Sequence, residues 1–128
     1  MLINENSKKF LAIASFLFAL AIAIGAFGAH GLKSIVSEKM LLTYNTGVEY
    51  HFYNTLGLFI IAIIMNFKEN SRKLLIAAWL LLIGLIIFSF SLYALVLLNM
   101  PILGAITPIG GTLLIISWLI VTYCILKE

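Results

Sequence analysis

One stretch of the sequence places polar side chains inside an otherwise apolar run. It is TGVEYHFYNTLGL, residues 46–58, and it carries Glu49, His51 and Asn54. A carboxylate within a membrane could bind a cation, and an imidazole could bind a metal or relay a proton. In a helix His51 and Asn54 share a face, because residues three apart are neighbours, whereas Glu49 and His51 do not face each other. The stretch therefore predicts hydrogen-bonding or binding groups, and not a Glu-His dyad within one helix.

The composition indicates that these groups lie in a membrane. The chain has 128 residues, of which 63% are hydrophobic and 10% are charged, and its mean hydropathy is +1.16. A soluble domain carries about 25% charged residues, so a water-soluble globule is excluded. In lipid the backbone is satisfied only in helices or closed barrels, and long continuous apolar runs favour helices. The predicted fold class is an all-α integral membrane four-helix bundle, one membrane domain over residues 1–128.

Four apolar runs have the length of a bilayer crossing, which takes about 20 helical residues. We expect transmembrane helices at residues 10–29, 47–67, 74–98 and 108–126. The first run is longer than the apolar region of a signal peptide, which favours a retained helix. Residues 34–44 alternate apolar and polar positions at helical spacing. This pattern predicts a short amphipathic helix in the plane of the membrane interface.

Two of the expected helices begin with recognisable signals. The pattern Thr46-x-x-Glu49 matches a capping box, in which the two side chains satisfy backbone N–H groups at the helix start. Thr107 followed by Pro108 combines a capping residue with a proline at the first helical position, where the missing N–H costs nothing.

Small residues mark expected positions of close helix packing. Rows of small residues spaced by four let helices approach where lipid offers no hydrophobic drive. In the first helix such a row predicts packing within the bundle or, as the alternative, a homodimer face. The row consists of Ala21, Gly25, Gly28 and Ala29. In the fourth helix Gly110 and Gly111 are likewise expected to allow close packing.

The basic residues predict the orientation. Six of the eight Lys and Arg residues lie in the N-terminal lead, the second connector and the C-terminus, while Lys33 and Lys39 lie in the first connector. Because cytoplasmic segments carry the excess of Lys and Arg, both termini are predicted to be cytoplasmic. The net charge of +3 does not point to nucleic acid, because the basic residues sit at helix ends and form no stripe.

A rise of 1.5 Å per residue places several polar groups at similar depths near the outward-facing helix ends. We interpret them as a hypothetical binding cluster, with structural hydrogen bonding between helices as the simpler reading. His30, His51 and Glu49 could supply three zinc ligands, but their spacing matches no metal motif, so neither a metal nor a cofactor is expected. The cluster consists of His30, Glu49, His51, Asn54, Ser89, Tyr93 and Thr107.

Four stretches of the chain together resemble a known family. They are GAFGAHGLK, TGVEYHFYNTLGL, FSFSLYAL and ITPIGG, beginning at residues 25, 46, 88 and 106. They are similar to the "domain of unknown function 423" family of small bacterial inner-membrane proteins. The resemblance implies a four-helix protein of the inner membrane and supplies no established activity. Relatives usually have Tyr-Gln-x-x-His where this chain has His51 and Asn54, so a role of that family histidine would not carry over.

The sequence shows no nucleophile elbow, phosphate-binding loop or pair of carboxylates. We therefore expect a protein without catalytic activity, a binding, scaffold or accessory subunit whose partners are the lipid bilayer and either a second copy or another membrane protein. The alternative is a small transport protein for an ion, proton or solute that uses the outward polar layer around Glu49. A membrane enzyme acting on a lipid or quinone is a third reading.

Overall fold

The computed structural model describes residues 3–127, and this part of the chain is almost entirely helical. Two short helical turns, η1 and η2, lie in the connectors between long helices. The elements are α1 (Glu5–Phe27), η1 (Gly28–Leu32, a π turn), α2 (Glu38–Phe67), α3 (Arg72–Leu97), η2 (Pro101–Ala105, a 3-10 turn) and α4 (Thr107–Lys127).

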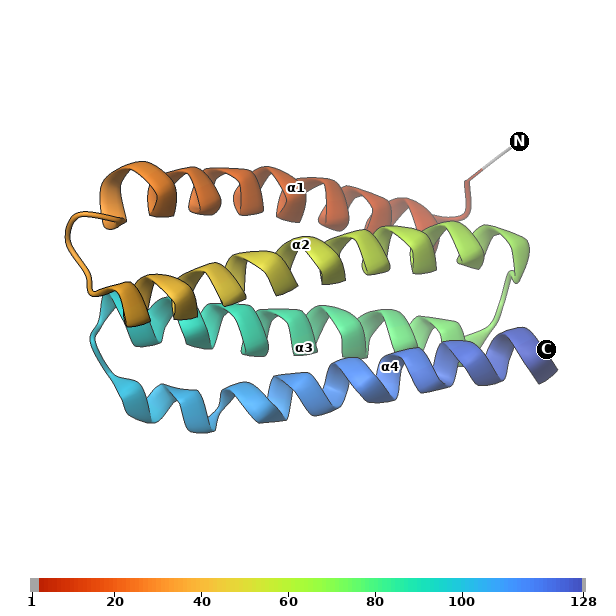
Figure 1. Ribbon diagram of the computed structural model, residues 1–128. Coiled ribbons are helices and arrows are strands. Elements are labelled where there is room, and N and C mark those ends of the chain that lie inside the picture. The colour runs from red at the N-terminus through yellow and green to blue at the C-terminus, as the bar shows by residue number, and fades with distance from the viewer. Residues whose placement is uncertain (1–2, 128) are drawn as a thin grey trace.

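The long helices run antiparallel, and each packs along the helix that follows it in the chain. α1 and α4 form the two outer sides of the bundle, with α2 and α3 between them (Figure 1). We call the end with the α2–α3 turn and both ends of the described chain the terminal end. The end with the α1–α2 and α3–α4 connectors is the far end.

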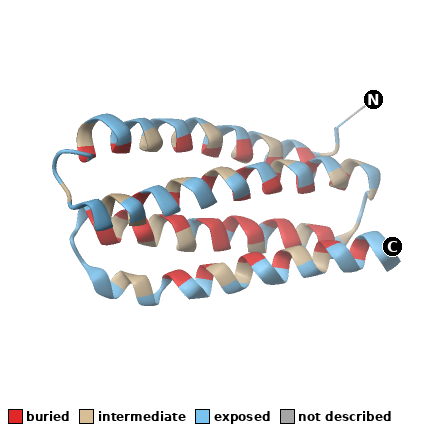
Figure 2. Cartoon of the chain, viewed as in Figure 1, coloured by how far each residue is buried: buried red, intermediate tan, exposed pale blue. Residues whose placement is uncertain are grey.

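Within residues 3–127 there are four helices that are long and apolar enough to cross a membrane, as the sequence predicts. α2 and α3 are half buried, whereas each outer helix buries a single stripe (Figure 2). Buried positions recur at alternating intervals of three and four, the spacing of helices that pack side by side. These positions are Ser7, Phe10, Ala14, Leu17 and Ala21 in α1, and Thr107, Gly110, Leu114, Ser117, Val121 and Cys124 in α4.

The structure differs from the expected start of the second span. α2 begins at Glu38, where the hydroxyl of Ser37 accepts a hydrogen bond from the Met40 N–H, and it continues unbroken to Phe67. The predictions of a separate in-plane helix at residues 34–44 and of a helix start at Thr46 are therefore wrong. The physical reason is packing: Tyr44 is buried at the far end against Leu92 and Tyr93 of α3, with Met40 beside it, so these turns continue the bundle.

The polar groups of the expected capping box act differently. The Thr46 hydroxyl donates to the Leu42 carbonyl of its own helix, and Glu49 is exposed. Both residues lie in the middle turns of α2, where backbone N–H groups are already bonded within the helix and need no cap.

The first helix also starts earlier than expected. Asn4 caps it by accepting a hydrogen bond from the Ser7 N–H, so α1 begins at Glu5, while the expectation was residue 10. The charged residues Lys8 and Lys9 thus belong to the helix and are exposed, and the Lys9 ammonium lies 5.1 Å from the centroid of the Trp79 ring in α3.

Small residues face neighbouring helices. Gly25 packs on Val48 and Gly28 on the ring of Tyr44, both in α2. Gly110 packs on the backbone of α3 at Gly84 and Phe88, whereas Gly111 only touches the Phe88 ring. The two glycines of the predicted row, Gly25 in α1 and Gly28 in η1, therefore serve packing inside the bundle, whereas Ala29 of that row is exposed.

Candidate functional site

A histidine-tyrosine pair lies between the two central helices. Nδ1 of His51 in α2 is 2.8 Å from the hydroxyl of Tyr93 in α3. His51 is fully buried and Tyr93 is 5% exposed. This bond brings the two residues to one level of the bundle, as the sequence predicts. The prediction counted the depth of His51 from a helix start at Thr46, although α2 begins at Glu38.

Close packing encloses the pair in aromatic side chains. Gly47 makes room for Tyr93, since a Cβ at Gly47 would lie 2.9 Å from the tyrosine ring. The ring of Phe90 lies 5.6 Å from the imidazole of His51, and the ring of Tyr44 lies 5.4 Å from that of Tyr93. The bond between Nδ1 and the Tyr93 hydroxyl thus lies in apolar surroundings, which strengthen it.

Three fully buried polar atoms, one of them in the pair itself, have no hydrogen-bond partner among residues 3–127. They are Nε2 of His51, Oγ1 of Thr55 and Oγ of Ser89. Ser89 lies one turn from Tyr93 on α3, and Thr55 lies one turn from His51 on α2. Thr55 is also two turns from both Val48 and Ala62, which contact α1, so it lies on the side of α2 toward α1. Burying such groups unpaired destabilises the fold.

A second polar contact joins α3 to the start of α4. The hydroxyls of Ser91 and Thr107 are 2.6 Å apart, and Ser91 also donates to the Phe88 carbonyl. Thr107 is mostly buried and is the first residue of α4. Thr107 was expected to precede the helix as its cap, whereas it is already helical, and its hydroxyl contacts Ser91 of the neighbouring helix.

The remaining members of the predicted cluster lie elsewhere. His30, in the π turn, and Glu49, on α2, are exposed. The Asn54 amide donates to the Tyr50 carbonyl of its own helix. The predicted set of seven thus divides into the His51–Tyr93 pair with Ser89, the Ser91–Thr107 contact and three residues outside both.

A metal centre has no support in this geometry. Among residues 3–127 no three His, Cys, Asp or Glu side chains gather closely enough to hold a metal ion. His51 is buried while His30 and Glu49 are exposed, so the three side chains considered as ligands do not share one environment.

Sequence reasoning missed two buried residues that tie α1 to α2. The Tyr44 hydroxyl donates to the Ile24 carbonyl at 2.6 Å, and the Ser7 hydroxyl donates to the Ala62 carbonyl at 2.6 Å. For Ser7 a signal existed, because it precedes Phe10 and Ala14 at the spacing of the buried stripe. Tyr44 was assigned to the in-plane helix, which concealed its role.

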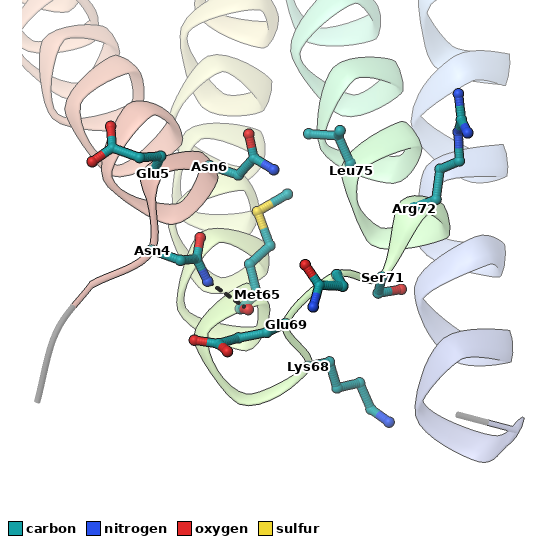
Figure 3. A pocket seen from close by; sticks show the side chains of 10 residues that line it. Asn4, Glu5, Asn6, Met65, Lys68, Glu69, Ser71, Arg72 and Leu75 are labelled. Atoms are coloured by element: carbon teal, nitrogen blue, oxygen red, sulfur yellow. Dashed lines mark hydrogen bonds between the residues drawn. The ribbon is translucent and has the colours of Figure 1, made fainter.

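The terminal end carries a pocket of about 570 Å³ between the start of α1 and the α2–α3 turn (Figure 3). The amide of Asn4 donates to the Met65 carbonyl at its edge. The lining carries amides and charges of both signs, so the pocket does not select an ion of one sign. It consists of Asn4, Glu5, Asn6, Met65, Lys68, Glu69, Asn70, Ser71, Arg72 and Leu75.

The four apolar helices and the hydrogen bonds between them define a multi-span helical membrane protein. The chain belongs to the family described as "Protein of unknown function (DUF423)", whose sequence profile matches residues 24–111. This match covers the connector at His30, the α2–α3 interface with His51 and Tyr93, and the start of α4.

Related proteins share nearly the whole chain. The UPF0382 membrane protein YwdK of Bacillus subtilis is 41% identical over 120 residues, covering 94% of this chain and 98% of that protein. The UPF0382 membrane protein SERP0230 of Staphylococcus epidermidis is 42% identical, covering 94% and 97%. A UPF0382 membrane protein of Haemophilus influenzae is 36% identical, covering 91% and 92%. No solved structure matches this chain.

Proposed function

We propose that this protein is a non-catalytic scaffold of the bacterial inner membrane that works by packing against another transmembrane helix. Both termini face the cytoplasm, so the terminal end is the cytoplasmic end and the far end is the outer one. The excess of Lys and Arg at the terminal end supports this orientation.

The observation that carries the proposal is where the buried polar side chains make their bonds. His51 bonds Tyr93, Ser91 bonds Thr107, and Ser117 donates to the Ala77 carbonyl, in each case between two helices. Polar groups used in this way hold helices at fixed positions in lipid. Glu49, on which the transport reading depends, is exposed and lies outside this buried set.

The surface that we assign to binding is the outer face of α1. As an outer helix α1 buries only one stripe, and its exposed side carries a row of small residues that would let a second helix approach closely. The occupant that we propose is α1 of a second copy of this chain. The exposed small residues are Ala12, Ser15, Ala19, Ala23 and Ala26.

Self-association in vesicles tests this assignment. Energy transfer between labelled copies, measured over a range of protein-to-lipid ratios, should report a dimer for the wild type. Ala19→Leu should abolish the dimer, because its side chain separates the two helices. Thr122→Leu adds similar bulk to the exposed side of α4 and should leave the dimer intact. A monomeric wild type, or equal dimerisation of all three chains, would overturn the assignment.

Flux through sealed vesicles tests the scaffold against the transport reading. Wild type and Glu49→Gln should both give the background flux of protons and small cations. A flux that is present in the wild type and absent in a folded Glu49→Gln variant would refute the scaffold function.

Labelling of introduced cysteines tests the orientation. In a Cys124→Ser background, Ile35→Cys at the far end should react with an impermeant thiol reagent added outside intact cells. Glu69→Cys at the terminal end should react only after the membrane is opened. The reverse pattern would show that the termini face outward.

A further inference from the structure

A groove between α3 and α4 opens on the lipid-facing side of the bundle at its terminal end. Its volume is about 440 Å³. Four aliphatic side chains form its walls, and a lysine and a tyrosine complete it. The lining residues are Lys73, Ile76, Ile116, Leu119, Ile120 and Tyr123.

The lining is ordered along the helix axes. Lys73 lies in the first turn of α3, and Tyr123 lies one turn before the end of α4. Ile116 is seven residues before Tyr123, which places it about 10 Å further into the bundle. The groove therefore has its charged group near the membrane surface and its aliphatic walls toward the bilayer centre, the polarity of a phospholipid.

The charge at the mouth of the groove is held in place. The Lys73 ammonium lies over the ring of Tyr123, 5.7 Å from its centroid, an attraction that restrains a flexible side chain. Arg72 precedes Lys73, and Lys127 lies in the last turn of α4. Three positive charges thus lie at the terminal ends of the two helices that form the groove, while the acidic residues of this end within residues 3–127, Glu5 and Glu69, lie on α1 and in the α2–α3 turn.

A second apolar pocket, which lacks a basic residue, serves as a comparison for the α3–α4 groove. It has a volume of about 230 Å³ and is lined by Ala23, Ile24, Phe27, Tyr44, Tyr93 and Leu97, so its walls are also apolar and aromatic. Its lining contains no Lys or Arg. Apolar surface occurs at both places, and the positive charge distinguishes the α3–α4 groove.

We propose that the α3–α4 groove binds one anionic phospholipid, with an acyl chain along Ile76, Ile116 and Leu119 and the headgroup phosphate at Lys73. Basic pockets between transmembrane helices recognise anionic lipids in this way. The site does not depend on the α1 surface assigned to self-association, and either can be present without the other.

Native mass spectrometry of the purified full chain tests the proposal. The protein is released from micelles containing phosphatidylglycerol or phosphatidylcholine with the same acyl chains. The wild type should retain one phosphatidylglycerol per chain in preference to phosphatidylcholine. Lys73→Gln should lower retention of phosphatidylglycerol about fivefold, the effect of losing one juxtamembrane charge, and Lys73→Arg should keep it.

Two further variants distinguish lipid binding in the groove from a general attraction between anionic lipid and the basic end of the protein. Lys9→Gln removes the same charge at the same end, from a lysine that lies over Trp79 instead, and should retain lipid as the wild type does. Leu119→Trp fills the groove from an exposed position and should lower retention of both lipids, with an unchanged circular dichroism spectrum showing that the chain is folded. Equal retention of the two lipids by the wild type, or equal losses in Lys73→Gln and Lys9→Gln, would overturn the proposal.

Discussion

Gly84 of α3 and Gly110 of α4 bring the backbones of these helices into direct contact. A Cβ at Gly110 would lie 2.7 Å from the Gly84 carbonyl oxygen and 2.5 Å from the Phe88 nitrogen. Backbone atoms cannot turn aside as a side chain can, so these glycines set the distance between α3 and α4. The residue next to Gly110 is also a glycine but faces a side chain, which provides a natural comparison.

Replacing Gly110 with alanine should destabilise the protein by about 1–3 kcal/mol, because the added methyl group forces the two backbones apart. Gly111→Ala should be neutral or slightly stabilising, since its Cβ would lie 3.6 Å from the Phe88 ring and alanine favours the helix. Thermal unfolding in detergent, followed by circular dichroism, measures both. Equal melting temperatures of the two variants would contradict the backbone contact.

The bond between His51 and Tyr93 should be measurable as a coupling free energy. Tyr93→Phe removes the hydroxyl and leaves the buried Nδ1 of His51 without its partner. A double-mutant cycle with His51→Phe should give a coupling of about 0.6 kcal/mol, the average for hydrogen bonds between membrane helices, and no more than about 1.7 kcal/mol, their maximum. Tyr53→Phe, at an exposed tyrosine, is the control and should not couple to His51→Phe. A coupling near zero for Tyr93 would show that the bond does not contribute.

Asn4 should fix the start of α1. Its side chain caps the helix at Ser7 and donates to the Met65 carbonyl, and its own N–H donates to the Asn66 side chain. Asn4→Ala should cost about 1 kcal/mol and raise hydrogen exchange over residues 5–9. Asn6→Ala, at an exposed neighbour on the same pocket, should leave this exchange unchanged. Exchange that rises equally in both variants would argue against the cap.

The start of α2 can be located by two matched substitutions. Ser37→Ala removes the observed cap and should destabilise the protein by about 1 kcal/mol. Thr46→Ala removes a hydroxyl that bonds within its own helix and should change stability by less than about 0.5 kcal/mol. Chemical unfolding of the purified protein compares the two, and a larger cost for Thr46→Ala would restore the helix start predicted there.

The sequence predicted the four spans because their lengths and apolar composition leave few alternatives in a bilayer. It also predicted that His51 and Tyr93 lie at one level, although it counted the depth of His51 from a helix start at Thr46, eight residues after the observed start of α2 at Glu38. The side on which a residue points was harder to predict. Glu49 and His51 are two residues apart, and rotation of α2 about its axis decides which of them is buried.

The in-plane helix shows a second limit of the sequence. Apolar residues at intervals of three and four are the same for a helix that lies on a membrane surface and for one that packs on its neighbours. The contacts of Tyr44 with Tyr93 of α3 and with Ile24 of α1 distinguish the two, and both join residues far apart in the chain. The capping-box pattern at Thr46 was misleading for a related reason, because a helix interior can contain the same letters.

The order in which the helices pack has a consequence for biosynthesis. Since each helix lies along its predecessor, every large interface can form as soon as the next segment leaves the ribosome and enters the bilayer. Assembly does not have to wait for the last segment to find the first. A chain interrupted after α2 already contains both partners of the Tyr44–Ile24 and Ser7–Ala62 hydrogen bonds, so we expect the α1–α2 hairpin to form before the rest of the protein is added.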